Sequence, residues 1–234
     1  MSVIKLTGGR VIDPANGVDD QVRDLYIRDG RLIAAPDAHD RISAEYNISG
    51  RIVMSGAIDM HSHIGGGKVN IAREMLPEDH RGDPVERTEL TRSSCGHAAP
   101  GTLAAGYRSA EMGYTAAFEP ALLPVNARQA HMEMGDTPML DTGGYAMLGS
   151  DDFLLRMLAA KEDQQAINDY VAWTLHATQT VGIKVVNPGA ISAFKFNQRK
   201  LDLDEQNAFY GITPREIVKV LSRAVHDLGV AKPL

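Results

Sequence analysis

The sequence has one cysteine, no long apolar run and no excess of positive charge. The single thiol, Cys95, cannot form a disulfide within the chain and suits a reducing cytosol. No stretch approaches the length of a membrane span, and residues 1–5 lack the apolar core of a signal peptide. The formal net charge of −6 argues against nucleic acid as the main partner. These absences favour a cytoplasmic protein that binds neither membrane nor nucleic acid.

The hydrophobic pattern changes at about residue 52. Of the 234 residues, 44% are apolar and 23% charged, which is ordinary for a globular protein of one or two domains. Residues 1–52 contain short β-type runs, with Asp29-Gly30 as a strong hairpin signal, and predict a small N-terminal β-module. In residues 53–234, strands alternate with helices, which predicts an α/β domain with a parallel sheet.

The expected elements after residue 52 follow a regular order. We expect strands at 52–63, 114–119, 138–142 and 182–189, and helices at 101–112, 127–134, 151–160, 162–180 and 213–228. Segment 64–100 is rich in glycine, proline and charge, so it is expected to be a long surface loop that serves as a lid or binding loop. Residues 230–234 are expected to begin a fifth strand.

Two histidines separated by one residue end the first expected strand. His61 and His63 point to the same face, because residues i and i+2 of a strand do so. A neutral imidazole is a good zinc ligand. Asp59 precedes the pair and Gly65-Gly66-Gly67 ends the strand. An isolated His-x-His pair often reflects chance or packing, but in this setting it predicts a metal site.

The strand expected at 182–189 contains a lysine. Lys184 lies among Ile183, Val185 and Val186, so its side chain is expected to enter the interior, where an unpaired ammonium is costly. An ammonium has only donors and cannot bind a metal. Carboxylated by carbon dioxide, the side chain becomes a carbamate whose two oxygens can bridge two metal ions. A salt bridge to an acid, or exposure at the strand end, is the alternative; with the histidine pair nearby we favour the carbamate.

Short motifs from the first expected barrel strand to the end of the chain resemble a known family. The β-module, the His-x-His strand and the interior lysine resemble the amidohydrolase superfamily. Within it, the chain resembles the family formed by the A-subunits of formylmethanofuran dehydrogenases and of bacterial formyltransferase/hydrolase complexes. The motifs are His61-Ser62-His63-Ile64, Lys68-Val69-Asn70, Pro77-Glu78-Asp79-His80-Arg81, Gly106-Tyr107-Arg108, Met112-Gly113-Tyr114-Thr115, Asp136-Thr137-Pro138, Tyr170-Val171-Ala172-Trp173, Ile183-Lys184-Val185-Val186-Asn187-Pro188-Gly189 and Ile212-Thr213-Pro214-Arg215-Glu216-Ile217.

The resemblance implies a fold and a metal site. The fold is a (β/α)8 TIM-type barrel, with residues 53–234 as its first half and residues 1–52 as part of a composite β-sandwich. The site holds two Zn²⁺, with His61 and His63 on one ion and carboxylated Lys184 bridging both. Two further histidines and a catalytic aspartate of the family fall beyond Leu234. We therefore expect a fragment, or a site completed by another polypeptide, that is inactive alone.

The resemblance also implies an activity and partners. The reaction is zinc-dependent hydrolysis, or reverse synthesis, of the N-formyl amide of formylmethanofuran or a related formyl-furan carrier, releasing formate in one-carbon metabolism. Formate release, the bacterial direction, is favoured. The partners are the other subunits of the complex, which are formyltransferase-like and glutamate-synthase-like. The alternatives are a cyclic-amide amidohydrolase of the dihydroorotase or hydantoinase type, and a non-catalytic scaffold protein of the same complex.

The expected loop at 64–100 supplies candidates for binding the carrier. Lys68, His80 and Arg81 are placed to meet an anionic carrier tail, although an ordinary solvated loop is the alternative. Glu119 ends the second expected strand and faces the expected mouth of the site. The remaining candidates are assigned to inert, packing or surface roles: Cys95, His97, His131, His176 and His226.

Overall fold

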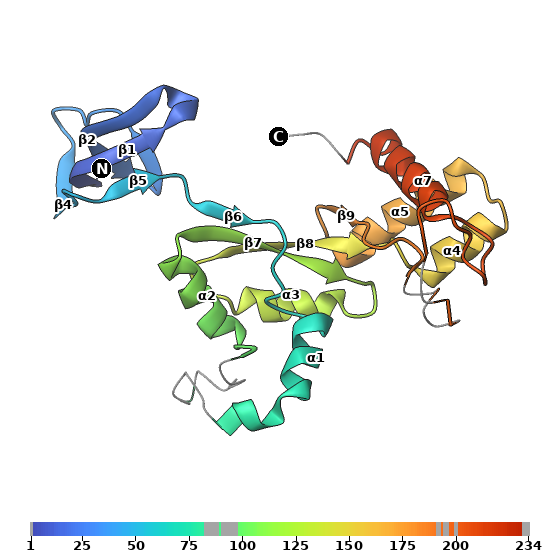
Figure 1. Ribbon diagram of the computed structural model, residues 1–234. Coiled ribbons are helices and arrows are strands. Elements are labelled where there is room, and N and C mark those ends of the chain that lie inside the picture. The colour runs from blue at the N-terminus through green and yellow to red at the C-terminus, as the bar shows by residue number, and fades with distance from the viewer. Residues whose placement is uncertain are drawn as a thin grey trace. The chain divides into compact units, whose positions relative to one another are not determined.

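The computed structural model describes residues 2–81, 89, 98–190, 193, 197–198 and 201–230. The chain divides into two compact units, Met1–Gly56 and Ala57–Leu234 (Figure 1). Among the described residues, none of the helices combines the length and the apolar character that crossing a membrane requires.

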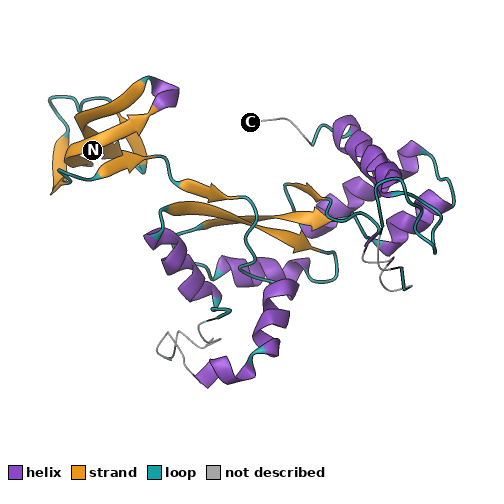
Figure 2. Cartoon of the chain, in the orientation of Figure 1, coloured by secondary structure: helices purple, strands orange, loops and turns teal. Residues whose placement is uncertain are grey.

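The N-terminal unit is a five-stranded sheet. Its strands are β1 (Ser2–Asp13), β2 (Val18–Arg28), β3 (Arg31–Ile33), β4 (Arg41–Asn47) and β5 (Ile52–Met54), and a short 3-10 helix, η1 (Pro14–Asn16), joins the first two (Figure 2). The strand order is β3-β2-β1-β4, and β5 pairs with β1. Between β2 and β3, Asp29 and Gly30 have φ angles of 51° and 74°, so the predicted tight hairpin turn is confirmed.

The second unit contains a four-stranded parallel sheet in the order β6-β7-β8-β9. The prediction of parallel strands joined by helical crossovers is confirmed, and α2 and α3 lie along β7 and β8 (Figure 1). The elements are β6 (Ala57–Asp59), α1 (Gly67–Met75), η2 (Pro77–Arg81), α2 (Thr102–Glu111), β7 (Tyr114–Leu122), α3 (Ala127–Gly135), β8 (Asp141–Met147), α4 (Asp152–Ala159), α5 (Gln164–Thr178), β9 (Gly182–Lys184) and α7 (Pro214–Asp227).

The second unit has two apolar clusters. One packs α4, α5 and α7 together, and its most buried members are Leu148, Leu154, Leu155, Ile167, Val171, Ile217, Leu221 and Ala224. The other lies between α3 and the sheet and contains Ile64, Ala117, Leu122, Ala130, Met134 and Leu140. Burial of these side chains is the main force that holds the helices against the strands.

The prediction of one buried strand over 52–63 is wrong. The segment forms two strands, β5 and β6, which belong to different sheets. The apolar side chains of this segment are not buried either, because Ile58 and Met60 are 58% and 57% exposed. The physical reason is that β6 is an edge strand whose only neighbour in the described sheet is β7.

The third strand of the sheet begins and ends later than predicted. The sequence predicts 138–142, ending at Gly143-Gly144, but both glycines lie inside β8. A Cβ on Gly143 would lie 2.7 Å from Cε1 of Phe118, and one on Gly144 would overlap the side chain of Leu122 and approach the carbonyl oxygen of Glu119 to 3.0 Å. The glycines therefore provide room for side chains of β7 and do not end the strand.

The second strand does not end at Pro120 as predicted. β7 continues through Pro120 to Leu122, and its pairing with β8 shifts register between Glu119 and Leu122. A proline has no N–H for the ladder, and an irregularity of this kind accommodates it.

The long loop predicted for 64–100 is wrong in its first part. Residues Gly67–Met75 form α1. Its N-cap, Gly66, makes no side-chain cap hydrogen bond, so the start signal on which sequence reasoning depends is missing. Polar contacts hold the helix instead: Asn70 and Arg73 donate to the carboxylate of Glu133 on α3. Residues 82–88 and 90–97 lie outside the described part of the chain.

The helix start predicted at Thr213 is confirmed. The Thr213 hydroxyl accepts from the Glu216 N–H at 3.2 Å, and the Glu216 carboxylate accepts from the Thr213 N–H at 2.7 Å. This reciprocal pair is a capping box. The fifth strand predicted at 230–234 lies almost entirely outside the described residues.

Replacing Thr213 by alanine is expected to destabilise the first turn of α7 by about 1 kcal/mol, because a helix N–H loses its acceptor. Hydrogen exchange of the Glu216 amide in the full-length protein would then accelerate by roughly fivefold. Ser222→Ala, which removes an exposed hydroxyl further along the same helix, is the control and leaves exchange unchanged. Equal rates in the wild type and the Thr213 variant would contradict the capping role.

Candidate metal centre

The two histidines lie at the carboxyl end of the parallel sheet. They follow β6 directly, where the Ser62 N–H donates to the Phe118 carbonyl at 2.9 Å and keeps the chain beside β7. The Asp59 carboxylate accepts from the His61 N–H at 2.9 Å. The two imidazole rings are 5.5 Å apart, centroid to centroid, and nearly perpendicular. Active sites of α/β barrels form at this end of the strands.

Lys184 reaches the first of these histidines from the last strand of the sheet. Its Nζ lies 3.2 Å from Nε2 of His61. In a flat sheet β6 and β9 would be about 14 Å apart, three strand spacings, so the two side chains bridge the carboxyl edge from its outer strands. Because an ammonium can only donate, the imidazole nitrogen accepts when the lysine is charged. Within the described residues, Lys184 thus meets a histidine and not the acid that a salt bridge requires. The strand predicted over 182–189 is wrong in length, because β9 ends at Lys184 and the lysine lies partly exposed at the end of the strand.

His63 rests on a buried carboxylate. Its Nδ1 lies 2.8 Å from Oε1 of Glu119, which also accepts from the Ala121 N–H at 3.1 Å. Glu119 is only 1% exposed, and its Oε2 has no hydrogen-bond partner among the described residues. Burial raises the pKa of Glu119, while the hydrogen bond and charge of His63 and the backbone N–H groups of Ala121 and Gly65 partly oppose that rise. The carboxylate is inside β7, underneath His63, and not at the end of the strand as expected.

The segment after His63 is tied to α3 through one carboxylate. Glu133 accepts from the Gly66 N–H at 3.0 Å, from Asn70 at 2.8 Å and from Arg73 at 3.4 Å. Burial acts to raise the pKa of Glu133, but these hydrogen bonds and the charge of Arg73 lower it overall. Gly66 has a φ of 89°, and a Cβ there would lie 2.9 Å from Cβ of Ala130, so only glycine allows this close approach.

Cavities open beside both histidines. One, of about 280 Å³, is lined by His63, Lys68, Val69, Ala72 and Pro100 among others, so α1 brings Lys68 next to the histidine pair. A second, of about 370 Å³, is lined by Met60, His61, Pro120, Tyr145, Ile183, Lys184 and Val185. His80 and Arg81 belong to η2, but their side chains are outside what the structure describes, so it does not place them at the site.

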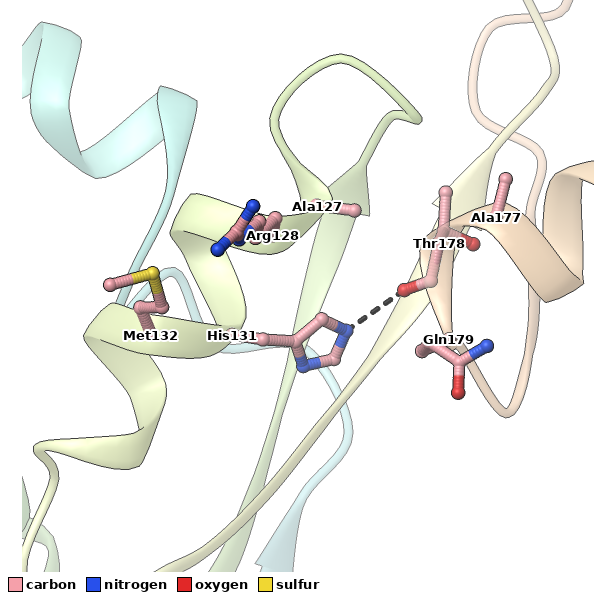
Figure 3. Close-up of a pocket in the computed structure, with 7 residues that line it drawn as sticks. All are labelled: Ala127, Arg128, His131, Met132, Ala177, Thr178 and Gln179. Atoms are coloured by element: carbon pink, nitrogen blue, oxygen red, sulfur yellow. Dashed lines mark hydrogen bonds between the residues drawn. The ribbon is translucent and has the colours of Figure 1, made fainter.

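The other histidine candidates lie on helices. His131 of α3 and His176 of α5 are on helices as expected, and Nε2 of His131 lies 2.8 Å from the carbonyl oxygen of Thr178 in a separate cavity of about 410 Å³ (Figure 3). His226 is on α7.

Two further candidates, Cys95 and His97, lie outside the described residues. Among those that are described, no three His, Cys, Asp or Glu side chains form a group that could hold a metal.

The sequence matches a known family over most of its length. Residues 44–230 match the profile of the Amidohydrolase family. The chain belongs to this family. Its N-terminal β-sheet and its parallel sheet, which forms part of the family's barrel, confirm the predicted fold class.

Three comparisons identify similar amidohydrolases. The chain is 41% identical over 234 residues to the A-subunit of the formyltransferase/hydrolase complex Fhc of Methylorubrum extorquens, covering 98% of this chain and 41% of that protein. It is 35% identical over 225 residues to protein FwdA of Methanocaldococcus jannaschii, covering 96% and 39%. The crystal structure of the Methylorubrum extorquens FhcABCD complex with methylofuran matches with a TM-score of 0.85 and 39% identity, covering 99% and 41%. The predicted resemblance to these A-subunits is confirmed, and this amidohydrolase chain spans about two fifths of these relatives.

Proposed function

We propose that this chain contributes the first metal ligands of an A-subunit that hydrolyses the N-formyl amide of a formyl-furan carrier, or forms it in reverse. The meeting of His61, His63 and Lys184 at one end of the sheet supports this proposal, together with 41% identity to the A-subunit of an Fhc complex. In hydrolysis, water adds to the formyl carbon, the C–N bond breaks, and formate and the free amine leave.

The proposed partners are the other subunits of such a complex, which are formyltransferase-like and glutamate-synthase-like. Residues 1–52 contribute to a composite β-sandwich, and residues 53–234 are the first half of the barrel.

The donor groups suit two zinc ions. Glu119 engages Nδ1 of His63, so Nε2 is the nitrogen available to a metal, and Nε2 of His61 points at the lysine amine. His61 and His63 would hold one ion, and carboxylated Lys184 would bridge both. When bound, zinc supplies Lewis acidity towards a carbonyl and makes water more acidic. The remaining ligands and the catalytic aspartate come from outside this chain's 234 residues.

The residues around the pair bind and orient the carrier. Lys68 lines the same cavity as His63, so its ammonium is positioned to bind an anionic group of the carrier. His80 and Arg81 are the other residues of segment 64–100 proposed, from their charge, to bind the carrier tail. The cavity beside Lys184 is walled mainly by apolar side chains, which are suited to orient the formyl group.

We test this function on the full-length protein, expressed with its neighbouring subunits. Formate release is measured from a formylated furan amine, and ring opening is measured for dihydroorotate and for hydantoin, before and after metal removal with a chelator. We expect two zinc per chain, formate release from the furan amine, no ring opening of either cyclic amide, loss of formate release after chelation, and recovery with zinc. Turnover of a cyclic amide instead would indicate the dihydroorotase or hydantoinase class. A folded complex without metal and without turnover would indicate a scaffold protein.

A further inference from the structure

We propose that Glu119 is a positioning residue that holds His63 as the Nδ1–H tautomer and so directs Nε2 towards the metal. The part of this inference that concerns metal affinity rests on the proposed function. The tautomer itself is a property of the chain and can be measured without metal. Glu119 does not touch the substrate, so its effect is exerted through His63.

The hydrogen bonds around Glu119 determine the direction of the contact. Oε1 accepts from the Ala121 N–H at 3.1 Å, and this same oxygen faces Nδ1 of His63 at 2.8 Å. A backbone N–H can only donate, so Oε1 is already an acceptor. The simplest complete arrangement is a carboxylate oxygen that accepts from both, which places the ring proton on Nδ1. Nε2 then carries the lone pair that a metal requires.

The burial of Glu119 points to a role beyond packing. Its side chain is 2% exposed, whereas that of His63 is 38% exposed, so the carboxylate lies on the protein side of the ring. The neighbouring residues Ala117 and Leu122 are buried and apolar. Burying a carboxylate in such surroundings is costly, and the side chain that it contacts is the candidate metal ligand His63.

The backbone of β7 explains how the carboxylate reaches His63. Pro120 follows Glu119 directly, and the pairing with β8 shifts register between Glu119 and Leu122. Irregularities of this kind commonly re-aim a side chain next to an active site. In a regular strand, side chains point alternately to the two faces of the sheet. At this irregularity the Glu119 carboxylate instead folds back onto its own strand, where Oε1 accepts from the N–H of Ala121, two residues later.

The first test measures the tautomer in the metal-free complex. Magic-angle-spinning NMR of ¹⁵N-histidine-labelled full-length protein reports which ring nitrogen is protonated, and subtraction of the His63→Gln spectrum assigns the signals. We expect the Nδ1–H tautomer in the wild type and a shift of the proton towards Nε2 in Glu119→Ala. An Nε2–H tautomer of His63 in the wild type would overturn the proposal, whether or not the Glu119 variant folds.

The second test measures zinc affinity by competition with a chromophoric chelator. We expect Glu119→Gln to weaken binding by about 10- to 100-fold. Glu111→Gln is the control, because Glu111 is an exposed glutamate at the end of α2, and the affinity of this variant is expected to stay close to that of the wild type. Equal affinity in the wild type and Glu119→Gln, or equal losses of affinity in both variants, would show that Glu119 has no specific effect on zinc binding.

If the wild type bound no zinc, the proposed function would fail. The tautomer measurement would still decide the role of Glu119.

Discussion

Replacing Lys184 by alanine is expected to lower formate release by the full-length complex at least about a thousandfold, equivalent to about 4 kcal/mol of transition-state stabilisation. The reason is that Lys184 is the only proposed ligand in this chain that serves both ions, and it approaches His61 to 3.2 Å. Zinc content is measured on the same sample and is expected to fall below two ions per chain. The wild type labelled with ¹³C carbon dioxide is expected to show a carbamate signal that the variant lacks.

The control for Lys184 is another lysine whose side chain is far from the proposed chemistry. Lys219 is exposed on α7, and Lys219→Ala is expected to leave turnover and zinc content unchanged. Full activity in Lys184→Ala would exclude the bridging role. Loss of activity with two zinc ions still bound would assign Lys184 to substrate contact and not to the metals.

Replacing Gly106 by alanine is expected to destabilise the protein by about 3 kcal/mol or to displace α2. Gly106 faces the turn before β8, where a Cβ would lie 2.6 Å from Cδ and 2.9 Å from N of Pro138 and would also overlap its carbonyl oxygen. Two of these three atoms belong to the backbone, which cannot rotate away, so the helix or the turn must move. Thermal unfolding of the full-length protein, with hydrogen exchange of α2, measures both outcomes.

Gly135→Ala is the matched control because Gly135 also lies in a helix, at the end of α3. No described atom lies within 4 Å of a Cβ placed there. Alanine is the better helix former by about 1 kcal/mol, so this change is expected to be neutral or stabilising. Equal stability of Gly106→Ala and the wild type would contradict the close packing of α2 on Pro138.

Sequence alone predicts the features that depend on near neighbours in the chain. Helix caps are recognisable as polar residues just before an apolar-periodic segment: Thr213 is one, and Asp151 or Asp152 is another. In the structure Asp151 is the cap, and the side chains of Asp151 and Thr213 accept from the N–H groups of Leu154 and Glu216. The hairpin at Asp29-Gly30 follows from the left-handed conformation that these residues tolerate. The parallel order of the strands follows from their alternation with helices.

The candidate site is predictable in part for the same reason. His61 and His63 are two residues apart, so their proximity is a local property of the chain, although both lie beyond the end of β6. Lys184 is singled out by its apolar sequence neighbours together with the presence of the histidine pair. Neither pattern predicts that His61 and Lys184 lie close together, because they are 123 positions apart in the sequence and only the packing of the sheet brings them together.

By itself, then, the sequence determined the helix caps, the hairpin and the parallel order of the strands. It also pointed to the histidine pair and the lysine as candidate site residues. Each of these features depends on residues that are adjacent in the chain or on the composition of one segment. Tertiary structure alone decided that residues 52–63 divide between two sheets and that Gly143 and Gly144 lie inside a strand. It also decided that Glu119 turns inward to hold His63. These features depend on contacts between residues distant in sequence, where the space and hydrogen bonds offered by one strand override the local preference of another.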